Sequence, residues 1–296
     1  MVFCLLACAA GMMWQFAPAA SPEDQILADV ANHAARFWES ATLYVGRETW
    51  RTTIPQAASA APRRFHRHSR PAPDSSSSIP AHEVVSYYAF SGFRKSPEAL
   101  REFRQIVSID GKKVKGDTSL EAFESGLARS DDRWRQKLLD DFEDAGEGGE
   151  VTDFGQILLL FTKASQHHYQ FHIARYAELN NQPAIVLVYE QASGNQSVHF
   201  ISGLQTEDKQ PLRGELWVRQ QDRLPLKVGM TATHKEGGNA IRDEAEVVYA
   251  PLPDGALLPE SVTHLRYVRD KLISKDTLSY SDWQRLPAAR PPEPVR

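Results

Sequence analysis

Cysteine is almost absent from this chain, since its 2 cysteines, Cys4 and Cys8, both lie near the start of 296 residues. Beyond residue 8 the sequence therefore excludes a disulfide framework, a zinc–thiolate site and a cysteine nucleophile. An excess of positive charge is missing as well, because 34 lysines and arginines face 38 aspartates and glutamates. Nucleic-acid-binding proteins normally show a net basic footprint, so the formal charge of -4 predicts no nucleic-acid partner.

Long hydrophobic runs are also scarce, and the clearest one covers residues 2–16. This run is shorter than the ~20 apolar residues that cross a bilayer as a helix, so no stable transmembrane span is predicted. Small residues at 17–20 precede Ser21, as at the cleavage site of a secretory signal. Residues 1–20 therefore indicate an export leader and a periplasmic or secreted protein. Because no lysine or arginine precedes the run, a displaced start site or a buried apolar N-terminus is the alternative.

Cys8 offers a second route to the cell envelope. The tetrapeptide Leu5-Leu6-Ala7-Cys8 resembles a bacterial lipobox, in which the cysteine becomes lipidated. The alternative localisation is therefore a protein that is lipid-anchored through Cys8. In either case the body of the exported chain has no cysteine to oxidise, which suits an oxidising compartment.

Recognisable catalytic and cofactor motifs are missing. The sequence has no Gly-x-Ser-x-Gly elbow for a serine nucleophile, and no Gly-x-Gly-x-x-Gly or phosphate loop. His167, His168 and His172 lie in a segment with strand alternation, where positions four apart are ~13 Å apart and do not share one ion. Three further histidines stand singly on predicted strands: His199, His234 and His264. We predict no cofactor, no metal and no enzymatic activity, with a hydrolase of unrecognised site as an alternative.

The stretch 213–234 shows the period-two alternation of a β-hairpin on both sides of a polar turn at residues 220–223. Glu215, Trp217 and Arg219 fall on one side of the first predicted strand. The opposite side of the hairpin is apolar and is expected to face the interior. Its members include Leu216, Val218, Leu226, Val228 and Met230.

The same alternation recurs along most of the chain. Further strands are predicted over residues 43–54, 83–93, 100–109, 112–114, 168–179, 184–191, 198–204, 240–250, 256–268 and 271–283. Their connections carry turn chemistry, such as Asn180-Asn181-Gln182-Pro183. Long consecutive antiparallel strands twist and curl. The sequence therefore predicts a mainly β (α+β) fold, in which a curved antiparallel sheet forms an open half-barrel.

Helical spacing interrupts the strands in three places. Ser21, with carboxylates in the turn that follows, begins an amphipathic N-terminal helix. Two inserted helices are predicted, one over 119–144 and a shorter one over 154–163 that Thr152-Asp153 caps. Residues 157–161 of the shorter helix are apolar nearly all round, so we predict that it is buried and plugs the hollow of the sheet.

Two segments lack apolar periodicity. Residues 55–80 are rich in alanine, proline and serine, which is typical of a disordered insertion. Their basic stretch 63–70 is expected to be a solvated loop, with binding to anionic lipid or an acidic partner as the alternative. The Pro-rich tail 287–296 is expected to be loose. Since the insertion separates strands of one pattern, residues 21–286 are predicted to form a single half-barrel domain.

The hairpin also carries a family resemblance. Gly214-Glu215-Leu216-Trp217-Val218, a polar turn and Leu224-Pro225-Leu226-Lys227-Val228 resemble the hairpin of the periplasmic lipoprotein-carrier (LolA/LolB-like) superfamily. The likeness is to uncharacterised exported bacterial members. It implies a half-barrel whose concave apolar face holds acyl chains under helical lids. The insertion 55–80 and the helix 119–144 depart from the compact carriers, and the resemblance assigns no binding residue.

These observations predict an exported, non-enzymatic protein that binds a hydrophobic ligand, such as a lipid, a lipoprotein or its acyl chain. The alternative is an envelope scaffold protein with a filled core, which would bind an envelope partner protein. The predicted ligand lining is Leu158, Phe161, Leu216, Val218, Leu226, Val228 and Met230.

Overall fold

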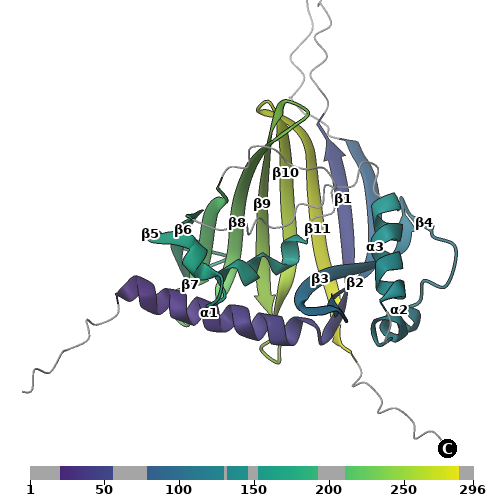
Figure 1. Ribbon diagram of the computed structural model, residues 1–296, viewed down its shortest axis with the longest axis horizontal. Coiled ribbons are helices and arrows are strands. Elements are labelled where there is room, and N and C mark those ends of the chain that lie inside the picture. Colours follow the sequence, from purple (N-terminus) through teal and green to yellow (C-terminus); the bar gives the residue numbers. More distant parts are fainter. Residues whose placement is uncertain (1–20, 56–78, 130–131, 146–152, 193–210, 287–296) are drawn as a thin grey trace, which may run out of the picture.

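The computed structural model describes residues 21–55, 79–129, 132–145, 153–192 and 211–286. Within them the chain forms one eleven-stranded antiparallel sheet in the order β4-β3-β2-β1-β11-β10-β9-β8-β7-β6-β5. The sheet is open, since β4 and β5 stand at its two edges. Figure 1 shows a curved half-barrel, with helix α1 across its foot and the short teal helix η1 over its inner face. The predicted fold class is confirmed.

The described strands fall into two groups, separated by the inserted helices. The first group is β1 (Tyr44–Ile54), β2 (Ile79–Phe93), β3 (Ser96–Ile109) and β4 (Lys112–Lys113). The second group is β5 (Tyr169–Leu179), β6 (Gln182–Gln191), β7 (Arg213–Arg219), β8 (Pro225–Glu236), β9 (Asn239–Pro251), β10 (Leu257–Val268) and β11 (Lys271–Arg285). Strand β1 pairs with β11, so the two groups join in one sheet.

Tight turns connect several of these strands. Asn180 and Asn181, between β5 and β6, have φ angles of 50° and 62°. Arg269 and Asp270, between β10 and β11, have φ angles of 51° and 62°. Two consecutive residues with positive φ give the turn whose twist matches that of the flanking strands. The long strands are therefore joined without loose loops at these points.

Helix α1 (Pro22–Ala41) begins where the sequence predicts. The Ser21 side chain accepts from the backbone N–H of Asp24, and the Asp24 carboxylate accepts from the backbone N–H of Ser21. This reciprocal capping box satisfies two helix-end donors. Val30 and Phe37 lie on the buried side of the helix. Helix α1 thus lays an apolar stripe against the inner face of the sheet.

The single helix predicted over 119–144 is wrong, because the structure has two helices, α2 (Leu120–Leu127) and α3 (Arg133–Ala145). The Arg135 side chain donates to the backbone oxygen of Leu127 at 2.6 Å, so it satisfies a carbonyl at the end of α2. The Trp134 ring lies against Gly126 so closely that a Cβ there would collide with it. The helical spacing of apolar residues continues through the break between α2 and α3, because both helices pack against the β1–β3 end of the sheet (Figure 1).

Helix η1 (Phe154–Phe161) occupies the predicted plug position over the inner face, but it is a 3₁₀-helix rather than an α-helix. Asp153 makes no side-chain capping hydrogen bond, contrary to prediction. Its carboxylate instead faces Arg101 at 3.6 Å. A second short 3₁₀-helix, η2 (Gln166–His168), leads into β5. Helix η1 is buried as predicted, because its apolar residues pack on the sheet.

The main core lies between the concave face, α1 and η1. One cluster of buried side chains joins these two helices to all strands of the sheet from β3 to β5 in the sheet order. A smaller cluster between α2, α3 and strands β1–β3 consists of Val45, Ala89, Phe103, Phe123, Leu127 and Leu138. The sheet therefore buries apolar side chains on its inner face, with the α2–α3 pair covering its other end.

Several predictions fall outside the described residues: the leader over 1–20, the strand over 198–204, His199, the tail 287–296, and most of the insertion 55–80. In the part of the chain that the structure describes, no helix combines the length and apolar character needed to cross a bilayer.

Candidate functional site

The seven residues of the predicted lining come together in the main core on the concave face. Each has a relative exposure of 7% or less. Leu158 and Phe161 project from η1, and the others come from β7 and β8. They are Leu158, Phe161, Leu216, Val218, Leu226, Val228 and Met230. Helix η1 thus contacts the apolar side of the hairpin, and lining of a ligand by these residues stays a prediction.

Helix η1 is tied to the sheet by a few polar contacts in addition to its apolar packing. The Tyr249 hydroxyl donates to the backbone oxygen of Gly155 at 3.0 Å and accepts from the backbone N–H of Leu158 at 3.2 Å. The backbone N–H of Gln156 donates to the Glu102 carboxylate at 3.2 Å. These contacts hold Gly155, Gln156 and Leu158, and the last residues of η1 up to Phe161 are held by side-chain packing.

A buried ionic cluster lies under the start of η1. The Arg104 guanidinium donates to Glu48 at 2.7 and 3.0 Å and to Glu102 at 2.8 Å. Asp153 lies 3.9 Å from the same guanidinium. Burial raises the pKa of Glu102 well above its usual range, although the charge of Arg104 opposes the shift. The arrangement is closed and paired, as buried charges require, and it anchors β1, β3 and η1 to one another.

A second polar group crosses the concave face on five neighbouring strands, β8, β9, β10, β11 and β1. We call it the polar belt. Direct register places His264 opposite Asp276, and Asp276 opposite Thr52. Its members are His234, Asp243, His264, Asp276 and Thr52. The belt borders the apolar core, because Phe154 of η1 packs against His264 with ring centroids 5.0 Å apart.

His264 sits between two carboxylates in the polar belt. Its Nε2 lies 3.0 Å from Asp243 Oδ1, and its Nδ1 lies 3.1 Å from Asp276 Oδ2. Burial alone would lower the pKa of His264, but the hydrogen bonds and charges of Asp243 and Asp276 outweigh it and raise the pKa to about 9. His264 is therefore an imidazolium at neutral pH, with both N–H groups donating.

The belt does not provide the arrangement of a hydrolase in which a histidine activates the nucleophile. A histidine that acts as general base must have one ring nitrogen free to accept a proton from the nucleophile. Both nitrogens of His264 are occupied by carboxylates, and the side chain is buried. Elsewhere His167 and His168 lie on η2, while His172 lies on β5. No set of described side chains is grouped to hold a metal ion.

Sequence reasoning named His264 only as a lone histidine and missed both aspartates. A signal was present, because strand alternation places His264 on the same side as Val262, and Asp276 on the same side as Leu278. Polar residues at inward positions of predicted strands therefore marked the belt. Their mutual contacts depend on the register between strands, which alternation within one strand does not determine.

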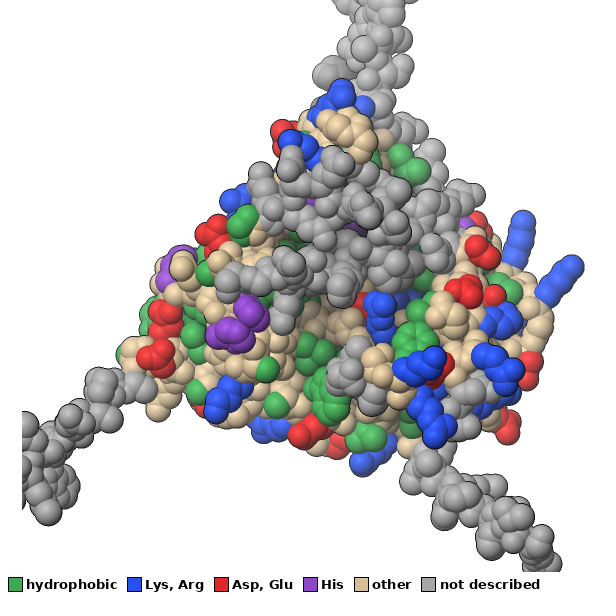
Figure 2. Space-filling model, viewed as in Figure 1, with side chains coloured by type: hydrophobic (Ala, Val, Ile, Leu, Met, Phe, Trp, Pro, Cys, Tyr) green, Lys and Arg blue, Asp and Glu red, His purple; other side chains and the backbone are tan. Residues whose placement is uncertain are grey.

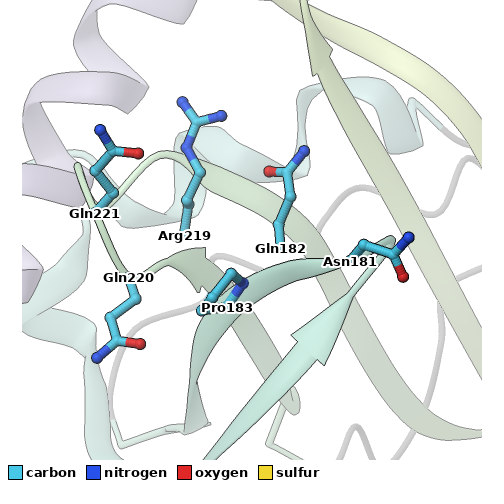
Figure 3. A pocket seen from close by; sticks show the side chains of 6 residues that line it. All are labelled: Asn181, Gln182, Pro183, Arg219, Gln220 and Gln221. Atoms are coloured by element: carbon cyan, nitrogen blue, oxygen red, sulfur yellow. The ribbon is translucent and has the colours of Figure 1, made fainter.

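A pocket of about 410 Å³ opens on the surface between two hairpin turns (Figure 3). Its lining is Asn181, Gln182, Pro183, Arg219, Gln220 and Gln221. The one charged group among them is already paired, since Arg219 donates to the Asp222 carboxylate at 2.8 and 2.6 Å. The pocket lies at the turns between β5 and β6 and between β7 and β8 and offers no further charged group, so it is a weaker candidate than the concave face.

The exterior of this side of the molecule is mixed in character. Figure 2 shows hydrophobic side chains as scattered spots among charged and polar ones, with many lysines and arginines over the end that carries α2 and α3.

Comparison with known proteins yields similarity of structure only. No protein-family model matches the chain, and no curated protein matches its sequence. A solved structure described as an outer membrane lipoprotein-sorting protein domain, from Vibrio parahaemolyticus, is 11% identical with a TM-score of 0.40, covering 88% of this chain and 91% of its own. A LolA superfamily protein from Nitrosomonas europaea is 12% identical with a TM-score of 0.37, covering 88% and 94%.

A DUF1329 family protein from Desulfovibrio piger is 8% identical with a TM-score of 0.39, covering 88% of this chain and 92% of its own. The resemblance of the hairpin to the lipoprotein-carrier superfamily therefore stays a prediction from the sequence. At these scores the comparison assigns no role to any residue of this chain.

Proposed function

We propose that this chain is an exported, non-enzymatic protein that binds a hydrophobic ligand, such as a lipid or the acyl chain of a lipoprotein, on the concave face of its half-barrel. One observation carries the proposal: the apolar inner face is covered by α1 and η1, which are not part of the sheet. The resemblance of the 213–228 hairpin to lipoprotein carriers agrees with it.

Helix η1 is the element that a ligand would replace. Its inward side chains, Ile157, Leu158 and Phe161, are at most 1% exposed and lie on the sheet where an acyl chain would lie. Each methylene that a ligand buries contributes ~0.8 kcal/mol. Burial of a long acyl chain would therefore offset the free energy of apolar burial that is lost when η1 is displaced. Displacement of η1 by a ligand would break the hydrogen bonds of Gln156 to Glu102 and of Gly155 and Leu158 to Tyr249.

Ligand binding is tested with the full chain and a fluorescent fatty-acid probe, alongside native mass spectrometry of the purified protein. Leu158→Ala and Phe161→Ala shorten the competing side chains of η1, so both are expected to raise probe affinity while lowering stability. Leu138→Ala is the matched control, because it truncates a buried side chain in the separate α2–α3 cluster. It is expected to lower stability without changing probe affinity.

A second candidate function follows from how completely the core is filled. If η1 is a permanent part of the core, the chain is an envelope scaffold protein that acts through its surface. In that case Leu158→Ala lowers stability, and neither the original chain nor any η1 variant binds the probe. That result would contradict ligand binding and favour the scaffold function.

Export and anchoring are tested separately. We propose a periplasmic or secreted location, with lipid attachment at Cys8 as the alternative. The mass of the mature protein from a bacterial host distinguishes cleavage after the leader from a diacylated Cys8, and Cys8→Ala abolishes any lipid-dependent mass increase. A full-length, uncleaved and soluble product would contradict both routes.

A further inference from the structure

The two aspartates of the polar belt differ in how well they are satisfied. Asp276 Oδ1 accepts from Thr52 at 2.6 Å and from the Trp50 indole at 3.2 Å, while its Oδ2 contacts His264. The charge of Arg266 also acts on Asp276. Asp276 therefore has donors on both of its oxygens.

Asp243 is less well satisfied, although it is more deeply buried. Its residue exposure is 0%, and its Oδ1 contacts His264. Its Oδ2 has no hydrogen-bond partner, and His234 Nδ1 lies 3.9 Å from it. A carboxylate offers about four acceptor positions, and a buried oxygen left without a donor is costly. The belt thus has a donor-deficient anionic oxygen at Asp243.

This oxygen lies at the border of the apolar core. Asp243 is two residues from Ala245 on β9, and His264 is two residues from Val262 on β10, both of which belong to the core cluster. Two residues along a strand span roughly 7 Å. A ligand chain that occupies the core in place of η1 therefore has Asp243 within reach of its polar end.

We propose that the polar belt is a head-group site for an amphiphile with a primary ammonium group, with Asp243 Oδ2 as the acceptor. An ammonium group supplies both the missing N–H donor and a compensating positive charge. A carboxylate head group would supply neither and would be repelled by Asp243. This inference rests on the proposed function, because the head group reaches the buried Asp243 by the same displacement of η1, whose Phe154 packs on His264.

The test compares three ligands of equal chain length, dodecylamine, dodecanol and dodecanoate, each displacing an uncharged hydrophobic fluorescent probe from the full-length protein at neutral pH. A charge-assisted hydrogen bond is stronger than a neutral one, so dodecylamine is expected to bind about tenfold more tightly than dodecanol. Asp243→Asn keeps the shape but removes the charge, and is expected to reduce this preference to about twofold or less. Glu215→Gln, which alters a carboxylate paired with Arg175 outside the belt, is the matched control and should retain the preference.

The outcomes separate the two proposals. If no ligand displaces the probe, or the probe itself does not bind, the proposed function fails. If all three ligands bind with similar affinity, the function stands and the head-group site is wrong. If Asp243→Asn retains the full preference for dodecylamine, the proposed head-group site at Asp243 is also wrong. Should Asp243→Asn not fold, the comparison of ligands on the unaltered protein decides, because it requires no variant.

Discussion

At the residue scale, one glycine explains part of the hairpin motif that carries the family resemblance. A Cβ at Gly214 would collide with the backbone oxygen of Gly229 on the neighbouring strand, and would lie 2.9 Å from the Tyr189 hydroxyl. That hydroxyl donates to the same Gly229 oxygen at 2.9 Å. Because the nearest obstacle is backbone, it cannot rotate away. The motif position requires glycine for close approach of β7 and β8.

We therefore expect Gly214→Ala to lower the free energy of unfolding by about 2–3 kcal/mol, the range for overpacking a buried site. Gly229→Ala is the matched control, since a Cβ there would meet nothing closer than 3.9 Å. It should change stability by less than about 1 kcal/mol. Urea unfolding of both variants measures the difference, and equal losses would contradict the close-approach explanation.

His264 makes stability depend on pH in a defined window. Its folded-state pKa of about 9 lies above the ordinary value of 6.5. The protonated form is therefore favoured by folding: its contribution is fully present below pH 6.5 and is lost as pH rises toward 9. The shift in the pKa of His264 corresponds to a contribution of at most about 3 kcal/mol to the free energy of unfolding. We expect the free energy of unfolding to fall over this interval, measured by urea unfolding at several pH values.

His264→Gln should remove this part of the pH dependence, and should cost about 3 kcal/mol near neutral pH because Asp243 and Asp276 lose their shared cation. The raised pKa of Glu102 contributes a slope of the same sign, so the difference between the two proteins is the decisive quantity. His33→Gln is the control, because burial lowers the pKa of His33 and moves its effect below the window. An unchanged slope in His264→Gln would refute the imidazolium assignment.

At the scale of elements, α1 shows which boundaries a sequence can predict. Ser21 and Asp24 form the capping box from residues three apart, so the information is local. We expect Ser21→Ala to lower the free energy of unfolding by about 1 kcal/mol. Ser40→Ala near the end of the same helix is the control, because Ser40 donates to the backbone oxygen of Arg36, which the helix already uses. Thermal unfolding compares the two, and a larger effect at Ser40 would contradict the cap.

The inserted helices show where local information ends. The apolar spacing of 119–144 continues through the break between α2 and α3, since both pack on one cluster. The break depends on contacts between the helices themselves, Trp134 on Gly126 and Arg135 on the Leu127 carbonyl. The 3₁₀ geometry of η1 likewise depends on partners far along the chain, such as Tyr249 and Glu102. Periodicity alone predicted the burial of these segments but not their backbone geometry.

At the scale of the whole molecule, the half-barrel could be predicted because alternation and turn chemistry repeat along most of the chain. Within β8, Val228 is fully buried on the concave side, while Lys227 lies on the opposite face against the Trp217 ring at 4.5 Å. The belt could not be predicted in the same way, because His264, Asp243 and Asp276 meet only through the register of three strands. The sequence therefore predicted which apolar side chains face inward, but not the polar residues that contact one another among them.

The inner face also sets how ligand affinity should grow with chain length. If an acyl chain lies along the core, burial of each added methylene contributes ~0.8 kcal/mol to the binding free energy. This contribution corresponds to about a fourfold gain in affinity. Fatty acids of roughly eight to roughly sixteen carbons are thus expected to bind with this increment until the face is filled, measured by probe displacement. Val228→Thr, which places a hydroxyl on the concave side of β8, should weaken the longer chains most. Lys227→Thr changes the adjacent residue on the opposite face, and its binding series should match that of the original protein. A flat dependence on chain length, or equal loss in both variants, would place the ligand outside the half-barrel.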